Sequence, residues 1–142
     1  MKIKLIYSNF DEQTGISIAR INTNLGEFEG TSKLHEEDRN ITSNYAGCQY
    51  AETRATLKYI KKRIQILNYQ LKGLENYQKQ LMNRKSYKHE DYASRALRKQ
   101  IYLVKRDKYN WQSRYDSLST KLYNAMMHRD KIVEKMTKKK GV

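Results

Sequence analysis

Apolar residues recur at steps of three and four along two long stretches of this chain. The first stretch contains Leu57, Ile60, Ile64, Leu67, Leu71, Leu74 and Leu81. The second contains Leu97, Ile101, Val104, Trp111, Tyr115, Leu118, Leu122, Ala125, Ile132 and Met136. A period of about 3.5 is typical of helices that meet along a narrow seam, whereas strands alternate with a period of about two. The pattern predicts helices over 48–83 and 90–138, joined by a hinge at 84–89 into a coiled-coil-like antiparallel hairpin.

The start of the chain shows a different pattern. Runs rich in β-branched and aromatic residues cover 2–7, 15–21 and 26–34, and turn-forming residues separate them at 8–15 and 23–26. Short strands at such intervals favour an antiparallel β-meander. A sheet this small needs a cover, and we expect the first helix to supply it. The sequence therefore predicts one α+β domain over 1–142, with a sheet at 1–35, a loop at 36–47 and a frayed tail at 139–142.

Further apolar residues lie off the helical seam. Tyr102, Tyr109 and Tyr123 are separated by multiples of seven, and Tyr59 and Ile66 form a similar stripe on the first helix. A hairpin has one seam to bury, so a second stripe usually means that another chain packs there. We therefore expect a homo-oligomer.

Positive charge is concentrated in the helical part of the chain. The protein has 29 basic and 15 acidic residues, a formal net charge of +14. Residues 1–40 hold five basic and seven acidic side chains, a net of −2, so the remainder carries +16. Such a surface attracts phosphates in nucleic acid, small nucleotides or anionic lipid. A charge that serves only solubility is the alternative.

The sequence carries no recognisable catalytic or metal-binding motif. There is no phosphate-binding glycine loop, and His35, His89 and His128 lie far apart. Capping of a helix accounts for the acidic run at 36–38 better than a divalent ion does. The single cysteine, Cys48, excludes an internal disulfide, and we expect a small buried side chain there rather than a nucleophile. We expect no enzymatic activity, no cofactor and no metal.

The chain also lacks the signals of membrane or secreted proteins. No apolar run is long enough to span a bilayer, and no signal peptide is recognisable. We therefore expect an intracellular, soluble protein that makes no membrane contact.

Cations and aromatic rings alternate around the expected hinge. Tyr92, Arg95, Arg98 and Lys99 follow one another at spacings that place them on one helical face. Arginine offers a bidentate fork to phosphate and tyrosine offers a flat face to a base, so the pattern suits a nucleotide. Tyrosine packing on arginine stems is the structural alternative. A second basic cluster, for which a solvated stripe is an equal alternative, consists of Arg54, Lys58, Lys61 and Lys62.

The segment 28–62 resembles a pattern in small phage proteins. There, a strand ending in glycine leads to Leu-His-x-x-Asp, then a serine, a glycine turn, Ala-Glu-x-Arg-Ala and Lys-Tyr. The matching positions here are Gly30, Leu34, His35, Asp38, Ser43, Gly47, Ala51, Glu52, Arg54, Ala55, Lys58 and Tyr59. The hinge segment KSYKHEDYASRALRKQIY is similar to the start of the family's second helix. The family is the phage anti-Thoeris sponge family, the first type of Thoeris anti-defence protein, and the likeness extends over residues 15–102.

This resemblance implies a non-enzymatic protein of the host cytoplasm. Members bind and sequester a cyclised ADP-ribose made by a TIR-domain protein, and some also hold CBASS cyclic di- or trinucleotides. The family's plan, a small sheet and two long helices, assembles into dimers and hexamers. Carried onto the matching positions, the resemblance makes ligand-binding candidates of Arg54, Lys58, Tyr87, Tyr92, Arg95 and Arg98, with Arg20 and Lys33 as weaker candidates. It implies no role for the residues after 102.

Two other functions fit the same sequence. A basic coiled-coil protein could bind DNA or RNA, because charge alone does not distinguish a polymer from a small polyphosphate. Polymer binding should weaken steeply with salt, whereas a small ligand in a pocket should resist it. A scaffold coiled coil, which binds no nucleotide, is the third hypothesis.

Overall fold

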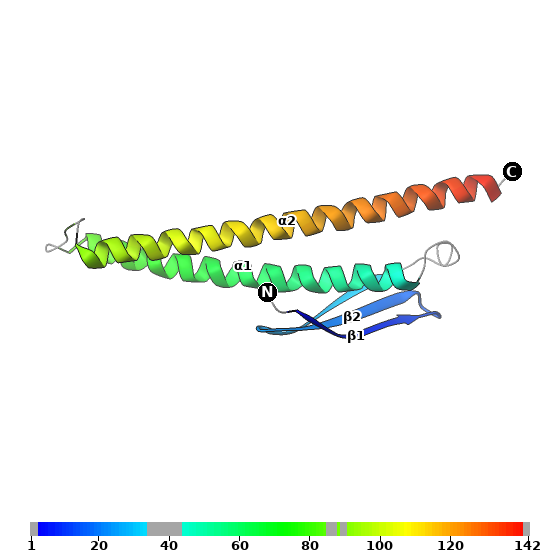
Figure 1. Ribbon diagram of the computed structural model, residues 1–142, viewed down its shortest axis with the longest axis horizontal. Helices are drawn as coiled ribbons and strands as arrows, with labels where there is room; N and C mark the ends of the chain where they lie inside the picture. The colour runs from blue at the N-terminus through cyan, green and yellow to red at the C-terminus, as the bar shows by residue number, and fades with distance from the viewer. Residues whose placement is uncertain (1–2, 34–43, 85–87, 89–90, 141–142) are drawn as a thin grey trace. The chain divides into compact units, whose positions relative to one another are not determined.

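The computed structural model describes residues 3–33, 44–84, 88 and 91–140, and side chains for 3–33, 47–84, 88 and 91–128. Figure 1 labels the helices and strands of the chain. The chain divides into two compact units: the first, called the sheet unit, contains residues 1–59 and 115–142, and the second, called the hairpin unit, contains residues 60–114. Both long helices contribute to both units. Within the described residues, neither helix is long and apolar enough to cross a membrane.

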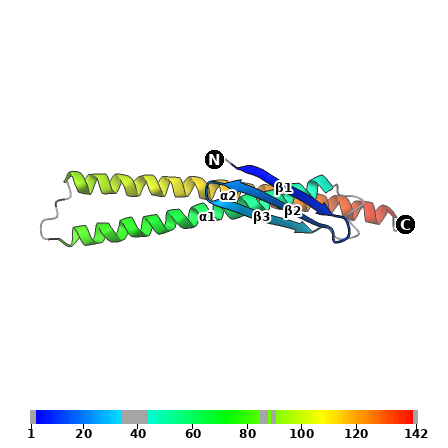
Figure 2. The same cartoon turned by 90° about the horizontal axis from the view of Figure 1, so that it is seen from below.

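Three antiparallel strands form the sheet in the order β1-β2-β3 (Figure 2). β1 is Lys4–Asp11, β2 is Ile16–Thr23 and β3 is Gly26–Lys33. The two turns use glycine at a positive φ, 74° at Gly15 and 107° at Gly26, a backbone conformation that other residues rarely adopt. The expected β-meander is confirmed.

β1 is longer than the sequence predicts. We expected a turn from residue 8, but Ser8 and Asn9 pair with Ala19 and Ile18, and the turn covers 12–15. Bonds to a neighbouring strand outweigh the weak strand propensity of serine and asparagine. The register shifts by one residue between Leu5 and Tyr7, as in a β-bulge.

The first helix, α1 (Asn44–Met82), covers one face of the sheet through small residues. Ala51 and Ala55 of α1 and Ala19 of β2 are fully buried. A Cβ at Gly30 of β3 would collide with the backbone of Ala51 and of Ala55, so the helix backbone rests directly on the strand. The expected cover is confirmed, although α1 begins at residue 44 instead of 48.

Tyr59 corrects one expectation. We placed it on an outer stripe available to another chain, but it is 1% exposed inside the sheet unit. Its ring meets Phe28 edge-on, with centroids 5.7 Å apart, and its hydroxyl donates a hydrogen bond to Asn24 Oδ1 at 2.6 Å. The sheet of the same chain therefore covers this side chain.

In the hairpin unit, α1 packs against the second helix, α2 (Tyr92–Lys140). Arg63 lies against Trp111, and Lys105 Nζ lies 3.9 Å from Glu75 Oε1, so the two helices run antiparallel. The seam residues Ile60, Leu97 and Ile101 are buried, which confirms the expected helical hairpin. Asp91 comes just before α2, where its carbonyl accepts the Arg95 amide at 3.0 Å.

Candidate functional site

Two of the candidate ligand residues bond to the outer edge of β3. Arg54 Nη1 donates to the Thr31 carbonyl at 2.8 Å, and Lys58 Nζ donates to the Glu29 carbonyl at 2.7 Å. Arg54 Nη2 also lies 3.7 Å from Met126 Sδ. We call Arg54 and Lys58 the β3 edge clamp, because they satisfy carbonyls that an edge strand leaves open. A phosphate at these positions would share its donors with the strand.

The two weaker candidates lie on the strands. Arg20 donates from Nη2 to Glu29 Oε2 at 3.0 Å, and this hydrogen bond, together with the charge of Glu29, raises the pKa of Arg20. Arg20 is therefore a charged partner of Glu29 throughout the physiological range. Lys33 is exposed at the end of β3.

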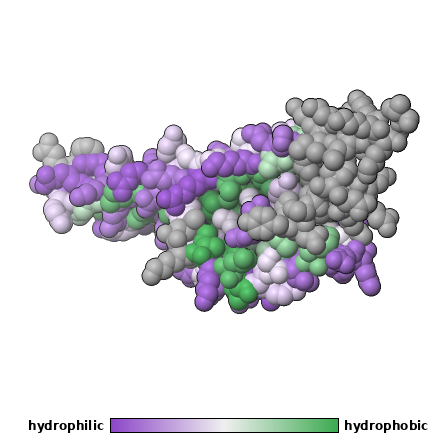
Figure 3. Space-filling view, turned by 45° about the vertical axis from the view of Figure 1, so that its right-hand side comes forward, coloured by the Kyte–Doolittle hydropathy of each residue, from purple (hydrophilic) through white to green (hydrophobic). Residues whose placement is uncertain are grey.

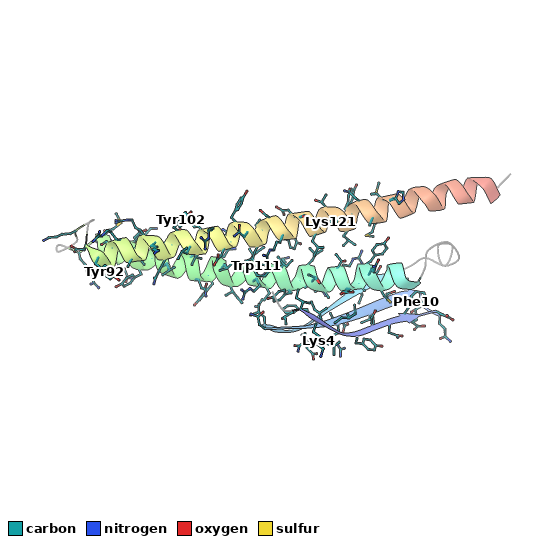
Figure 4. The ribbon with its side chains drawn as sticks, viewed as in Figure 1. Lys4, Phe10, Tyr92, Tyr102, Trp111 and Lys121 are labelled. Carbon is teal, nitrogen blue, oxygen red and sulfur yellow. The ribbon has the colours of Figure 1, made fainter. Side chains whose placement is uncertain are left out.

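An exposed face near the start of α2 combines rings and cations. Tyr92 and Tyr102, both labelled in Figure 4, are 82% and 64% exposed. Arg95 and Lys99 lie between them in the sequence and are also exposed. Steps of three, four and three residues keep the four side chains on one side of the helix. No described residue forms an ion pair with Arg95 or Lys99. We call these four residues the α2 face.

The other hinge candidates differ from the α2 face. Arg98 is half-buried and has an interaction partner within the protein, and Tyr87 lies outside the described residues. The candidate set thus divides between the two compact units. The sheet unit holds Arg20, Lys33, Arg54 and Lys58, and the hairpin unit holds Tyr92, Arg95 and Arg98.

Trp111 lies between two arginines, Arg63 and Arg114, and the sequence pattern did not predict this cluster. The Cζ atoms of Arg63 and Arg114 lie 5.0 and 4.9 Å from the ring centroid, within cation–π range. Arg63 Nε is buried without a hydrogen-bond partner among the described residues. Arg114 follows Trp111 by three positions, which the helical pattern could have revealed, whereas Arg63 comes from the other helix and required the register.

The sheet unit contains a polar groove between the start of α1 and the second half of α2. Its volume is about 420 Å³, which is in the range of small-molecule sites. Gln49, Tyr50, Glu52 and Thr53 line it from α1 and Lys121 from α2, together with two leucines and an alanine. Its amide, hydroxyl, ring and ammonium groups can bind the base and sugar of a nucleotide, whereas the carboxylate of Glu52 opposes a phosphate beside it.

The hairpin unit contains an apolar groove of about 540 Å³. Leu74, Leu103 and Val104 line it, with Gln70 and Gln100 at its margin. Gly73 contributes no side chain, and a Cβ built there would have no neighbour within 4 Å. The groove therefore has room beside Gly73 for a small side chain.

The described part of the chain contains one cysteine, Cys48, and one histidine, His128. No cluster of three or more histidine, cysteine, aspartate or glutamate side chains in it could hold a metal ion. Cys48 is a free thiol that is half-buried, where we expected a buried side chain, and His128 is exposed. The acidic run at 36–38, with His35 and His89, lies outside the described residues.

The structure defines an α+β protein in which a three-stranded meander precedes two long packed helices. No protein-family model, curated protein or solved structure matches the chain. The resemblance to the anti-Thoeris sponge family therefore stays a prediction based on the residues quoted above.

Proposed function

We propose that this protein binds and sequesters cyclic nucleotide immune signals in the host cytoplasm without degrading them. The expected ligands are cyclised ADP-ribose made by TIR-domain proteins and, as a second class, CBASS cyclic di- or trinucleotides. The resemblance of segment 28–62 supports this choice of ligand. The basic surface, with a net charge of +16 after residue 40, supports an anionic ligand in general.

The observation that carries the proposal is the α2 face. Its two exposed tyrosines offer stacking surfaces, and Arg95 and Lys99 offer charge-assisted hydrogen bonds to a pyrophosphate. A sequestering protein needs affinity alone, because it has no transition state to stabilise. The polar groove beside Lys121 is a second place where part of such a ligand could lie.

We also propose that the protein acts as a homo-oligomer, in which dimers assemble into hexamers. Tyr109 and Tyr123 are 72% and 63% exposed, and they continue an aromatic stripe along α2 from Tyr102. Exposed rings at this spacing suit contact with another chain. The remaining ligand candidates, in the β3 edge clamp and on the strands, stay predictions within this proposal.

Calorimetric titration with cyclic ADP-ribose isomers and cyclic di- and trinucleotides tests the proposal. Arg95→Ala removes a hydrogen bond to a charged group of the ligand. We therefore expect this variant to bind the ligand about tenfold or more weakly than the wild type does. Lys72→Ala is the matched control, because it removes one exposed charge from α1 of the same unit. We expect this control to bind within about twofold of the wild type.

Binding to DNA or RNA is the alternative function. It predicts that short oligonucleotides bind, that salt weakens this binding steeply, and that Arg95→Ala and Lys72→Ala lose affinity equally. Equal losses would contradict the proposed role of the α2 face, because they would indicate general electrostatic attraction.

A further inference from the structure

The two edges of the sheet differ in whether their outer backbone groups have hydrogen-bond partners. The β3 edge clamp satisfies the outer carbonyls of Glu29 and Thr31. β1 forms the opposite edge, and no described residue makes a hydrogen bond to its outer side. An open edge strand is a template for pairing with another strand.

The register identifies which β1 backbone groups point outward. Thr31 directs its carbonyl away from β2 to Arg54, and its neighbour across the sheet is Ile18. Backbone groups alternate in direction along a strand, so Ile18 directs its groups toward Asn9 of β1. The next residue, Ser8, therefore directs its N–H and C=O to the open side.

The side chains of β1 are also unusually apolar for an exposed edge. Leu5, Ile6 and Tyr7 are 43%, 48% and 46% exposed, and apolar surface gathers over the strands in Figure 3. Natural edge strands are usually protected by central charges, proline, a bulge or a cover. β1 has a bulge between Leu5 and Tyr7, but its register is regular from Tyr7 to Asp11. Its charges lie near its ends, with Lys4 at the start and Asp11 at the finish.

We propose that a second copy of this chain pairs with β1, antiparallel, to form one continuous sheet across a two-fold axis. Antiparallel pairing brings the Lys4 end of each strand to the acidic Asp11 end of the other. Residues 1–40 carry a net charge of only −2, so two sheets can approach where strongly basic helices would repel each other. The interface is isologous, and it does not depend on the proposed ligand.

Sedimentation of the full-length wild type and of variants in β1 tests this interface. Ser8→Pro removes the outward N–H, and the pairing of β1 with β2 does not use that group. Ser8→Ala keeps the N–H and is the control. Ile6→Lys places a charge on the edge by a different route. We expect wild type and Ser8→Ala to dimerise equally, and both other variants to raise the dissociation constant at least about tenfold.

Circular dichroism and thermal unfolding establish that each variant folds. If Ser8→Pro unfolds, Ile6→Lys against wild type carries the test. A wild-type monomer at tens of micromolar would overturn the proposal. So would an association that the folded β1 variants leave unchanged and that Tyr102→Glu abolishes, because the contact would then lie on α2.

Discussion

At the scale of single residues, small side chains determine how α1 meets the sheet. Gly30 faces the backbone of α1, and Ala51 and Ala55 are fully buried beside it. A helix can approach a strand this closely only where both surfaces lack bulk. Close packing at these positions also places Tyr59 against Phe28.

Gly30→Ala should destabilise the protein. The added methyl group collides with helix backbone that has no rotamer through which to move aside, so we expect a loss of about 3 kcal/mol in the free energy of unfolding. Chemical denaturation measures the loss. Gly73→Ala is the control with the same chemical change, and it should gain about 0.5–1 kcal/mol, because its methyl group enters open space in a helix. Equal effects of the two substitutions would contradict this packing.

Tyr59→Phe tests the buried hydroxyl. The substitution keeps the ring against Phe28 but leaves Asn24 without its donor, so we expect a loss of about 1 kcal/mol in unfolding free energy. The same substitution at Tyr69, which is 82% exposed on the same helix, should be nearly neutral. Thermal unfolding of the two variants side by side provides the comparison, and an unchanged Tm for Tyr59→Phe would contradict the assignment.

At the scale of elements, β3 and α1 depend on each other through the edge clamp. Lys58→Met keeps most of the aliphatic stem but loses the bond to the Glu29 carbonyl. We expect a loss of about 1 kcal/mol in unfolding free energy. Lys61→Met, an exposed neighbour, should change stability little. A loss of nucleotide affinity by folded Lys58→Met, measured well below its Tm, would add a phosphate contact to this structural role.

The sequence predicts the order and type of all the described elements, because each element has a strong local pattern. The 3.5-residue period revealed both helices, and the glycines at 15 and 26 marked the turns. The extension of β1 through Ser8 and the burial of Tyr59 could not be read in the same way, since both depend on contacts between segments far apart in the chain. The candidate site shows the same limit. The α2 face follows from helical spacing, whereas the bonds of Arg54 and Lys58 to β3 required the structure.

At the scale of the whole molecule, charge repulsion opposes the compact state. The part of the sequence after residue 40 carries +16. Two ion pairs, Arg20–Glu29 and Lys105–Glu75, have about half of each side chain exposed and contribute little. Sodium chloride shortens the range of repulsion from about 30 Å at 0.01 M to about 3 Å at 1 M. We therefore expect Tm to rise by a few degrees as salt increases, with sucrose as the uncharged control. A falling Tm would mean that attractive pairs dominate.

Sequestration without degradation can be tested with one experiment. The protein is incubated with a cyclic ADP-ribose isomer at low and at moderate salt, separated from free ligand by gel filtration, and then heat-denatured. We expect the bound nucleotide to elute with the protein at both salt concentrations and to be released chemically intact, as chromatography and mass spectrometry would show. Recovery of a hydrolysed product, or no retention of any cyclic nucleotide while DNA is retained at low salt only, would contradict the claim.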